Sequence, residues 1–405
     1  MSAAAYAPFG GSDPTGLAGK VILQMIPRLE AGGAERTTVD VAQALVRVGA
    51  RALVATEGGR LIVDLQIVGG AYVPFPAATK NPIKMLANIG RLARLIEQEG
   101  VDLVHARSRA PAWVALVATR RTDRRFVTTY HGDYSAQSRA KRLYNSVMAR
   151  GDCVIANSEY TSERVTELYP FARNRLKVIA RGADLVRFSR SAVESSRVAQ
   201  IRAAWDVAPE ARIILLPGRL TAWKGQKTLI EAASILHGEG LSNLAFVLAG
   251  DAQGRNAYLR ELGALIRARK LEGVVRIVGH CADMPAAFVA ASVVAAPSNL
   301  PEAFGRVAVE AQAMGVPVIV SDLGAARETV LAPPQADVAE RTGWLIPPDD
   351  PVTLAQVLKE ALEMGASARA QLAWRARARV ERDYSLERMT AETLKVYAGL
   401  LRPEA

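Results

Sequence analysis

Short runs of apolar and β-branched residues recur along the whole chain, and longer stretches of helical character separate them. Strands that alternate with helices favour parallel sheets covered by helices on both faces, which is the doubly wound α/β class. Twelve runs are predicted as strands: Val21–Ile26, Ala52–Ala55, Leu103–His105, Arg125–Thr129, Val154–Ala156, Leu176–Ile179, Ile213–Leu216, Ala245–Ala249, Val274–Val278, Val293–Ala296, Val316–Val320 and Gly343–Ile346.

The length of 405 residues and the number of strands predict two domains rather than one. Strand-like runs stop between residues 189 and 202, where Ser, Arg and Glu dominate. We predict a flexible tail over 1–19, an N-terminal Rossmann-like domain over 20–190, a linker over 191–204 and a C-terminal Rossmann-like domain over 205–385. Ligands of open α/β sheets bind beyond the carboxyl ends of the strands, so two facing domains would hold a ligand in a central cleft.

Composition excludes several classes of protein. Half of the residues are apolar and 22% are charged, which is typical of a folded chain. The longest apolar runs, such as Leu244–Ala249, fall far short of the roughly 20 residues that a membrane span needs. No secretory signal is visible, and two cysteines are too few for a disulfide framework or a zinc site. We expect a cytoplasmic protein without a metal site.

Positive charge is concentrated in the first third of the chain. Residues 1–150 contain 20 Lys and Arg against 11 Asp and Glu, whereas the remainder contains 31 against 29. A one-sided field of this kind attracts the phosphate of nucleic acid, anionic lipid or a phosphorylated saccharide. The alternative is a basic surface that is simply solvated.

Loops that follow two of the predicted strands carry groups suited to a phosphorylated ligand. Gly32 and Gly33 precede a helix, where the backbone can approach a ligand and helix amides face an anion. This loop matches neither the dinucleotide fingerprint nor the P-loop, and a structural turn is the alternative. Arg219 and Lys224 follow the seventh strand and would hold phosphate, unless they are solvated loop cations.

The segment Pro297–Gly315 is the most informative. A loop there carries Glu302, and an almost wholly apolar helix starts near Gly305, which indicates a helix buried between layers. Arg306 and Glu310 lie on one face of this helix and would form an ion pair in the simplest interpretation. Arg at a helix N-terminus opposes the macrodipole, so a docked anion would relieve the conflict. Glu302 would then accept hydroxyls of a polyol, and Glu310 those of a ribose.

Two histidines end or follow predicted strands. His131 lies beside Gly132 after the fourth strand and suits a cleft, although a lone His is more often packed or solvated. His105 ends the third strand and either reaches the same edge or caps a helix. The sequence contains no Asp-x-Asp pair, no His and Cys cluster with metal-ligand spacing and no G-x-S-x-G motif. The usual short motif for a metal-bound diphosphate is therefore missing.

Together these residues resemble the retaining GT-B glycosyltransferases of family 4 (glycosyl transferases group 1), over roughly residues 20–400. The strongest signature is the E-x7-E element from Glu302 to Glu310. Beside it stand the GGAER loop (32–36), the His131–Gly132 pair and the Arg219 and Lys224 pair. The stretch 181–188 is similar to the family's NGVDxxRF, with Arg181 in place of Asn and Ala for Val, departures from which we expect little consequence.

The resemblance implies a site and a reaction. The residues implied in catalysis are His131, Arg219, Lys224 and Glu302. The residues implied in binding a GDP- or UDP-linked sugar are Gly33, Arg219, Lys224, His280, Phe304, Gly305 and Glu310. Arg219 and Lys224 would hold the diphosphate, Glu310 the ribose and Glu302 the sugar hydroxyls, while His280 would lie near the base. The resemblance also implies a metal-independent reaction without a cofactor, and a C-terminal helix over about 386–405 that packs back on the N-terminal domain.

The acceptor is expected on the N-terminal domain. The segment His105–Trp113 is similar to that of some bacterial core mannosyltransferases, which implies acceptor contacts from His105, Arg107 and Arg109. The helix expected over Asn81–Gln98 and the basic run 139–142 suit docking on an anionic membrane, or else a core-facing helix with a wet basic face. We therefore expect mannose or glucose transfer to a lipid-linked, anionic saccharide such as lipopolysaccharide core, at the cytoplasmic face of the inner membrane.

Two other functions remain open at this point. A sugar-nucleotide epimerase of the same fold is one, although the E-x7-E element argues against it. A non-enzymatic binder of anionic lipid or nucleic acid is the other. It leaves Glu302 and Glu310 unexplained, and nucleic acid is not expected as a partner because only 6% of the residues are aromatic and no nucleic-acid motif occurs.

Overall fold

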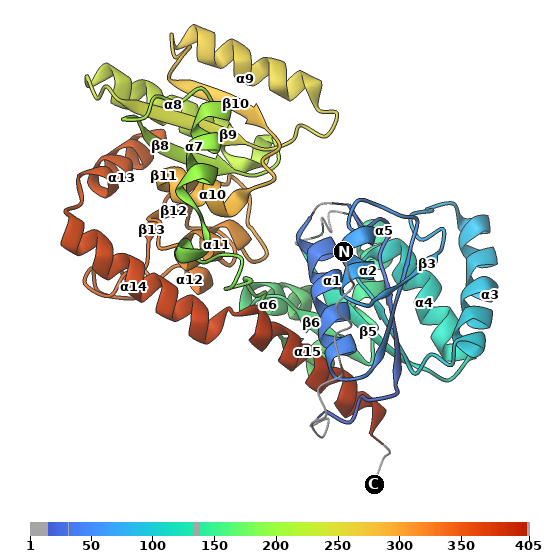
Figure 1. Ribbon diagram of the computed structural model, residues 1–405. Coiled ribbons are helices and arrows are strands. Elements are labelled where there is room, and N and C mark those ends of the chain that lie inside the picture. Colours follow the sequence, from blue (N-terminus) through green and yellow to red (C-terminus); the bar gives the residue numbers. More distant parts are fainter. Residues whose placement is uncertain (1–14, 31, 133, 135–137, 403–405) are drawn as a thin grey trace. The chain divides into compact units, whose positions relative to one another are not determined.

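The computed structural model describes residues 15–30, 32–132, 134 and 138–402, and Figure 1 labels its helices and strands. The chain divides into two compact units: Met1–Arg181 together with Leu386–Ala405 (unit 1), and Gly182–Ser385 (unit 2). Each unit is built on one parallel β-sheet with helices packed against it. This confirms the predicted doubly wound α/β class.

Unit 1 contains a seven-stranded sheet in the order β3-β2-β1-β4-β5-β6-β7, with parallel pairing throughout. Its strands are β1 (Val21–Met25), β2 (Arg51–Thr56), β3 (Ala71–Pro74), β4 (Leu103–Ala106), β5 (Arg125–Tyr130), β6 (Cys153–Ala156) and β7 (Leu176–Val178). The chain order reverses between β1 and β4, and ligands of this fold class bind beyond the carboxyl ends of the strands at such a point.

The helices of unit 1 are α1 (Gly33–Arg47), α2 (Ile62–Ile67), α3 (Pro82–Gln98), α4 (Arg109–Arg121), α5 (Arg139–Asn145), α6 (Glu159–Leu168) and α15 (Leu386–Leu401), with short 3-10 turns η1 (Ser146–Ala149) and η2 (Pro170–Arg175). The C-terminal helix α15 packs against α1. Its Met389, Leu394 and Tyr397 lie in one apolar cluster with Leu45 of α1 and Ile22 of β1. The helix expected to return to the first domain is thus α15.

Helix α3 starts where its sequence favours it, because the Asn81 side chain accepts the amides of Ile83 and Lys84 and Pro82 takes the first position. Ile89, Leu92 and Ile96 are buried in the core of unit 1. Ile83 and Leu86, nearer its start, are 78% and 68% exposed. The core-facing interpretation therefore holds for the later turns of α3 and not for the first.

Unit 2 contains a six-stranded parallel sheet in the order β10-β9-β8-β11-β12-β13. Its strands are β8 (Arg212–Pro217), β9 (Leu244–Ala249), β10 (Val275–Gly279), β11 (Ala291–Ala296), β12 (Val318–Ser321) and β13 (Trp344–Ile346). Its helices are α7 (Ser195–Ala204), α8 (Gln226–Gly238), α9 (Asn256–Ala268), α10 (Met284–Ala290), α11 (Arg306–Ala313), α12 (Ala326–Thr329), α13 (Pro351–Glu363) and α14 (Ala366–Asp383), with 3-10 turns η3 (Arg190–Ala192) and η4 (Ala222–Lys224). The central strands are apolar and buried, as parallel sheets covered on both faces require.

Three sequence expectations about organisation need correction. The strand β3 was not predicted, because it is short, only partly buried and ends on a proline. The predicted tail over 1–19 is wrong at Leu17, which is completely buried in the core of unit 1, and its residues 1–14 lie outside the described residues. The predicted linker is mostly helix: α7 packs against α10, and Arg197 holds Asp283 at 2.7 Å within unit 2. The boundary between the units falls at Arg181–Gly182.

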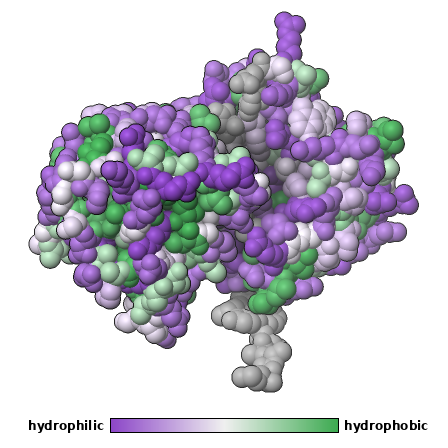
Figure 2. Space-filling view, turned by 90° about the horizontal axis from the view of Figure 1, so that it is seen from above, coloured by the Kyte–Doolittle hydropathy of each residue, from purple (hydrophilic) through white to green (hydrophobic). Residues whose placement is uncertain are grey.

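Within the described ranges, no helix combines the length and the hydropathy that crossing a bilayer requires. On the face shown in Figure 2, hydrophilic residues separate the apolar patches from one another.

Candidate active site

The polar residues predicted in the C-terminal half follow β8 and β11, which are neighbours where the strand order of unit 2 reverses. The loops after these strands touch each other. Gly225, after η4, has φ +74°, and a Cβ there would collide with the carbonyl oxygen of Pro297. The amide of Asn299 donates to the carbonyl of Trp223 at 2.8 Å. Glycine at position 225 is what permits this close approach.

Lys224 and Glu302 form the centre of this group. The ammonium of Lys224 lies 2.8 Å from Glu302 Oε1, and the Ser298 hydroxyl donates to the same oxygen at 2.6 Å. The Lys224 and Glu302 side chains are only 13% and 20% exposed. Burial opposes ionisation of Glu302, but the charge of Lys224, the Ser298 hydroxyl and the nearby Arg219 outweigh it and hold the pKa of Glu302 below its usual value. The carboxylate is therefore ionised at neutral pH.

The two predicted cations differ in their surroundings. Arg219 is exposed just beyond β8, and its guanidinium contributes to the field at Glu302. Lys224 is held by Glu302 and lies 4.3 Å from the centre of the Trp223 ring. An ammonium has three donors, so a second anion can still bind to Lys224 beside the carboxylate. Lys224 is thus a positioned cation rather than a solvated one.

Helix α11 begins beside Glu302. Gly305 caps it with φ +80°, a conformation that favours glycine, and no side chain caps the first amides of the helix. Phe304, 4% exposed, is fixed edge-to-face on Tyr384 at 5.7 Å. A cavity next to these residues is lined by Ser298, Glu302, Gly305 and Ser321, among others. The amide end of α11 therefore offers partial positive charge beside this cavity.

Buried polar atoms around these loops lack partners in the described part of the chain: Thr221 Oγ1, Asn299 Oδ1 and Ser321 Oγ. Buried polar groups of folded proteins are normally hydrogen-bonded. These three atoms therefore remain for water or a polar ligand to satisfy. Thr221 and Asn299 lie in the segments that follow β8 and β11, and Ser321 is the last residue of β12.

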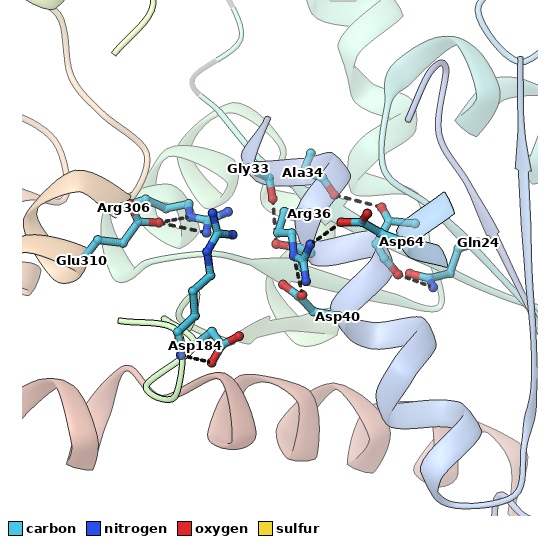
Figure 3. Close-up of polar contacts among 12 residues, drawn as sticks. Gln24, Gly33, Ala34, Arg36, Asp40, Asp64, Asp184, Arg306 and Glu310 are labelled. Carbon is cyan, nitrogen blue, oxygen red and sulfur yellow. Dashed lines mark hydrogen bonds and ion pairs between the residues drawn. The ribbon is translucent and has the colours of Figure 1, made fainter. Parts of the chain in front are cut away.

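Arg306 and Glu310 form an ion pair, which was the alternative to an anion docked at the start of the helix. Figure 3 shows the contact, in which Arg306 Nη2 and Nε lie 2.9 and 3.2 Å from Glu310 Oε1. Both contacts fall on the same carboxylate oxygen. Glu310 Oε2 has no hydrogen bond to any described residue, so it remains able to accept a hydroxyl. The pairing and the predicted ribose contact are compatible.

His280 lies apart from this group. It is exposed and follows β10, the edge strand, which is separated from β8 by β9. Neighbouring strands lie about 4.8 Å apart, so two strand spacings, roughly 10 Å, divide it from the loop after β8. His280 shares the carboxyl edge of the sheet but contacts neither Lys224 nor Glu302. Its role at the base stays a prediction.

In unit 1, His131 follows β5 at the carboxyl edge of the sheet and is held by Arg181. Arg181 Nη2 donates to His131 Nδ1 at 2.8 Å. Burial and the positive charge of Arg181 hold the pKa of His131 well below its usual value. Because Nδ1 accepts, the proton of the neutral ring lies on Nε2, which has no partner among the described residues. His131 is therefore a neutral ring with one unused donor.

The GGAER loop opens helix α1 after β1. Gly33 is the first residue of α1, Gly32 precedes it in extended conformation, and no side chain caps the helix. Figure 3 shows how Arg36 is fixed, through contacts of 3.0 Å to Asp40 and 2.8 Å to Asp64. Arg36 is thereby neutralised within unit 1. The amides at the start of α1 are left facing solvent or a ligand.

The predicted acceptor contacts of His105 and Arg107 are wrong, because both side chains are buried. His105 is completely buried, with Nδ1 2.5 Å from Tyr397 Oη of α15 and Nε2 2.7 Å from Thr129 Oγ1. Arg107 is 3% exposed and donates twice to Gln24 Oε1. These side chains hold the sheet and α15 together instead of meeting an acceptor.

Arg109 is the third predicted acceptor residue, and its guanidinium is likewise engaged. It donates to Asn145 Oδ1 at 2.9 Å and stacks 4.4 Å from the centre of the Tyr134 ring. It is only partly buried, so the structure leaves its predicted acceptor contact open.

Three residues of these sites were not predicted. Ser298 lies in the segment singled out from the sequence, but nothing in the pattern assigns its hydroxyl to Glu302. Arg181 was noted only as a departure from a family motif. Tyr397 reaches His105 from 292 positions away, and no local signal indicates such a contact. Within the described ranges, no three His, Cys, Asp or Glu side chains are grouped as metal ligands.

Two family models match the chain: Glycosyltransferase Family 4 over residues 31–187 and Glycosyl transferases group 1 over residues 198–379. Two curated relatives bear the name D-inositol 3-phosphate glycosyltransferase. The protein from Jonesia denitrificans is 33% identical over 53% of this chain. The matched region spans about half (50%) of that relative's length. The protein from Xylanimonas cellulosilytica is 29% identical over 91% of this chain and 92% of its own.

Two solved structures are similar over almost the whole chain. The crystal structure of a glycosyltransferase from Rickettsia africae has a TM-score of 0.85 at 31% identity and covers 95% of this chain and 100% of that one. The Anabaena protein Alr3699/HepE in complex with UDP-glucose has a TM-score of 0.81 at 26% identity and covers 94% and 99%.

Proposed function

The chain belongs to the glycosyltransferases, with a family 4 region and a group 1 region on doubly wound units of the GT-B fold, and from this premise we propose that it transfers a hexose from a nucleotide-diphosphate sugar to a phosphorylated acceptor. The observation that carries the proposal is the group formed by Lys224, Glu302 and Ser298 beside the uncapped start of α11. It places a fixed cation and a fixed carboxylate next to free helix amides, which suits a sugar joined to a diphosphate.

The proposed reaction follows from these charges. The bond between the sugar's anomeric carbon and the diphosphate oxygen breaks, and the anomeric carbon joins an acceptor oxygen. Lys224, Arg219 and the amides of α11 stabilise the negative charge that grows on the leaving diphosphate. The acceptor hydroxyl gives its proton to that diphosphate, so no carboxylate need act as nucleophile and the configuration is retained. We propose that these cations make a metal unnecessary.

Glu302 and His131 are assigned to the sugar. The Glu302 carboxylate is ionised and accepts hydroxyl groups while Lys224 and Ser298 fix its position. His131 donates from Nε2 to an oxygen of the sugar, and because its ring is neutral it adds no positive charge near a cationic transition state. Glu310 Oε2 accepts from the ribose.

The donor and the acceptor are proposed at class level. The neighbour solved with UDP-glucose makes UDP-linked glucose the first donor to test, with GDP-mannose second. A phosphorylated acceptor is supported by the names of the curated relatives and by the excess of basic residues in 1–150. A lipid-linked envelope saccharide is an alternative of the same anionic chemistry, for which the exposed Ile83 and Leu86 on α3 beside Lys84 would supply a membrane contact.

The test measures stabilisation by UDP, GDP and ADP on the unmodified chain and on Glu310→Ala and Lys224→Met. A ligand present at 100 times its Kd raises the free energy of unfolding by about 2.7 kcal/mol. We expect one nucleotide to stabilise the unmodified chain and to act much less on both variants. Lys227→Met, which removes a partly exposed lysine of α8 that pairs with Glu261, is the matched control and should keep the full effect.

Turnover is then assayed with the nucleotide sugar that matches, using inositol 3-phosphate and an anionic glycolipid as acceptors in the presence of EDTA. Product with an unchanged anomeric configuration supports the proposal, and loss of the leaving-group cation in Lys224→Met should lower kcat by roughly 10²- to 10³-fold. Sugar conversion without an acceptor would favour an epimerase instead. Absence of nucleotide binding would refute the donor assignment.

A further inference from the structure

A second basic site lies in unit 1 at the sheet edge opposite to His131 and Gly33. A hollow of about 390 Å³ there is lined by five arginines and two carboxylates: Arg120, Arg124, Arg125, Arg150, Arg175, Asp123 and Asp152. Arg125 opens β5, Arg150 lies shortly before β6, and Arg175 directly precedes β7. These strands are parallel neighbours, so their starts share the amino edge of the sheet.

Two of the arginines are held in place by the fold. Arg150 Nε donates to Ser146 Oγ at 3.2 Å, and its guanidinium lies 5.5 Å from the centre of the Phe171 ring. Arg175 donates to the carbonyls of Gly151 and Phe171 at 3.2 and 3.1 Å. Both are partly buried, and neither of these contacts neutralises their charge. They are therefore positioned cations at the wall of the hollow.

The remaining charges do not balance them. Arg120 and Arg124 are exposed, and within the described ranges neither forms an ion pair with a carboxylate. Asp152 accepts the backbone amide of Phe126 at 2.7 Å, which occupies part of its capacity. Even when Arg125, which interacts with other groups, is left out, the lining carries two more positive than negative charges.

A structural explanation covers only part of this cluster. Arg120 and Arg121 lie in the last turn of α4, where a cation stabilises the helix dipole. Arg175 ends the short 3-10 turn η2, Arg150 follows the short turn η1, and Arg124 lies beyond the end of α4. These three arginines come from separate segments, and the separate turn ends do not explain why they meet in one hollow. Bringing their like charges to one hollow is unfavourable unless an anion occupies it.

We propose that this hollow, the arginine hollow, binds a compound that carries two or more phosphate charges. Guanidinium groups grip phosphate oxygens in bidentate fashion, and the scarcity of apolar lining residues (Leu116 and Phe126) excludes a predominantly apolar ligand. The site is distinct from the nucleotide-sugar site because it lies at the amino ends of the strands, whereas the residues proposed to bind donor follow the carboxyl ends. The phosphate belongs either to a free oligophosphate or to a lipid headgroup.

The test uses inorganic pyrophosphate as the probe and the full chain saturated with UDP, which occupies any diphosphate site at the carboxyl edge. Calorimetric titration compares the unmodified chain, Arg124→Glu and Arg121→Glu. Arg121 is the matched control, because it is an exposed neighbour that does not line the hollow. A charge-assisted hydrogen bond contributes about tenfold or more in affinity, so Arg124→Glu should weaken binding by at least that factor while Arg121→Glu changes it much less.

A second arm measures flotation with vesicles of phosphatidic acid against vesicles of phosphatidylcholine. Pyrophosphate binding that depends on Arg124 assigns a free oligophosphate, and vesicle binding alone with the same dependence assigns a headgroup. Equal behaviour of Arg124→Glu and Arg121→Glu in both arms would overturn the proposal. If UDP does not bind at all, the proposed donor site fails, but the comparison of the two variants still decides on the arginine hollow.

Discussion

The contact between Lys224 and Glu302 makes a quantitative prediction. Glu302 is 20% exposed in the intact pair, and in Lys224→Met its carboxylate keeps, among the described residues, the Ser298 hydroxyl as its one side-chain hydrogen-bond partner. Removing one partner of a well-buried pair typically costs 3–5 kcal/mol, and the residual exposure of both groups places this pair near about 3 kcal/mol. Glu302→Gln should cost less, about 2 kcal/mol, because the ammonium retains the Trp223 ring and can shift toward solvent.

The double variant Lys224→Met with Glu302→Gln leaves neither charge uncompensated. Replacing both members of a buried pair by neutral groups is often nearly neutral, so its cost should fall below that of Lys224→Met alone. The coupling free energy between the two positions should then be about 2–3 kcal/mol.

Urea unfolding monitored by tryptophan fluorescence suits this measurement, because Trp205, Trp223, Trp344 and Trp374 belong to unit 2 and only Trp113 lies in unit 1. The matched control is the pair Lys227 and Glu261, 2.5 Å apart but 44% and 55% exposed. Its single variants should each cost under about 0.5 kcal/mol, with coupling under about 1 kcal/mol. If the losses in free energy of unfolding of the two single variants add to that of the double variant within about 0.5 kcal/mol, Lys224 and Glu302 are not energetically coupled and the argument from the buried pair is refuted.

The remaining predictions concern single positions. Tyr397→Phe leaves the buried His105 Nδ1 without its partner and should lower the free energy of unfolding of unit 1 by about 1–3 kcal/mol in urea; a loss below about 0.5 kcal/mol would contradict the contact. The pKa values of His105 and His131 are lowered in the folded chain, so both rings stay neutral there and the unfolded chain binds more protons below about pH 6.5. The free energy of unfolding should therefore fall as the pH decreases, by up to about 1.4 kcal/mol per pH unit for each of the two histidines. His131→Gln should reduce that slope relative to the unmodified chain. Gly305→Ala should cost about 1–2 kcal/mol from its φ of +80°, while Gly263→Ala, in the middle of α9, should stabilise unit 2 slightly; equal effects would refute the strain argument.

All twelve predicted strands occur in the structure with small shifts of their ends. Most of them are apolar runs buried within a sheet and so carry a strong signal, whereas β7 is a largely exposed edge strand that was predicted from its short apolar run alone. The elements that were missed lack that signal. β3 is a short edge strand with an exposed proline, and α7 buries none of its residues, so no apolar stripe distinguishes it from a linker. Buried apolar residues are therefore the main signal from which a helix or strand can be predicted.

The candidate site shows a similar division. Glu302 and Lys224 are recognisable because each follows a buried strand within a glycine-containing loop. Their contact is not, since it depends on β8 and β11 being neighbours in the sheet while 78 positions separate the two residues. His105 illustrates the opposite error: it ends a central strand, as a ligand-binding residue would, but its ring points into the core toward Tyr397 and Thr129.

Arg181 shows why a departure from a family motif can matter more than its position suggests. In the sequence it is one of two departures, with Ala183, from a stretch otherwise similar to NGVDxxRF, and the pattern alone predicts little consequence from it. In the structure it is the last residue of unit 1 and donates to His131 Nδ1 at 2.8 Å. A permanently charged donor at Nδ1 fixes the ring proton on Nε2, and its charge disfavours a second proton on the ring. The amide of an asparagine could also donate to Nδ1, but it carries no charge that would oppose the second proton. The role carried over from the family for His131 therefore rests on a neighbour that the family pattern does not contain, and only the contact reveals it.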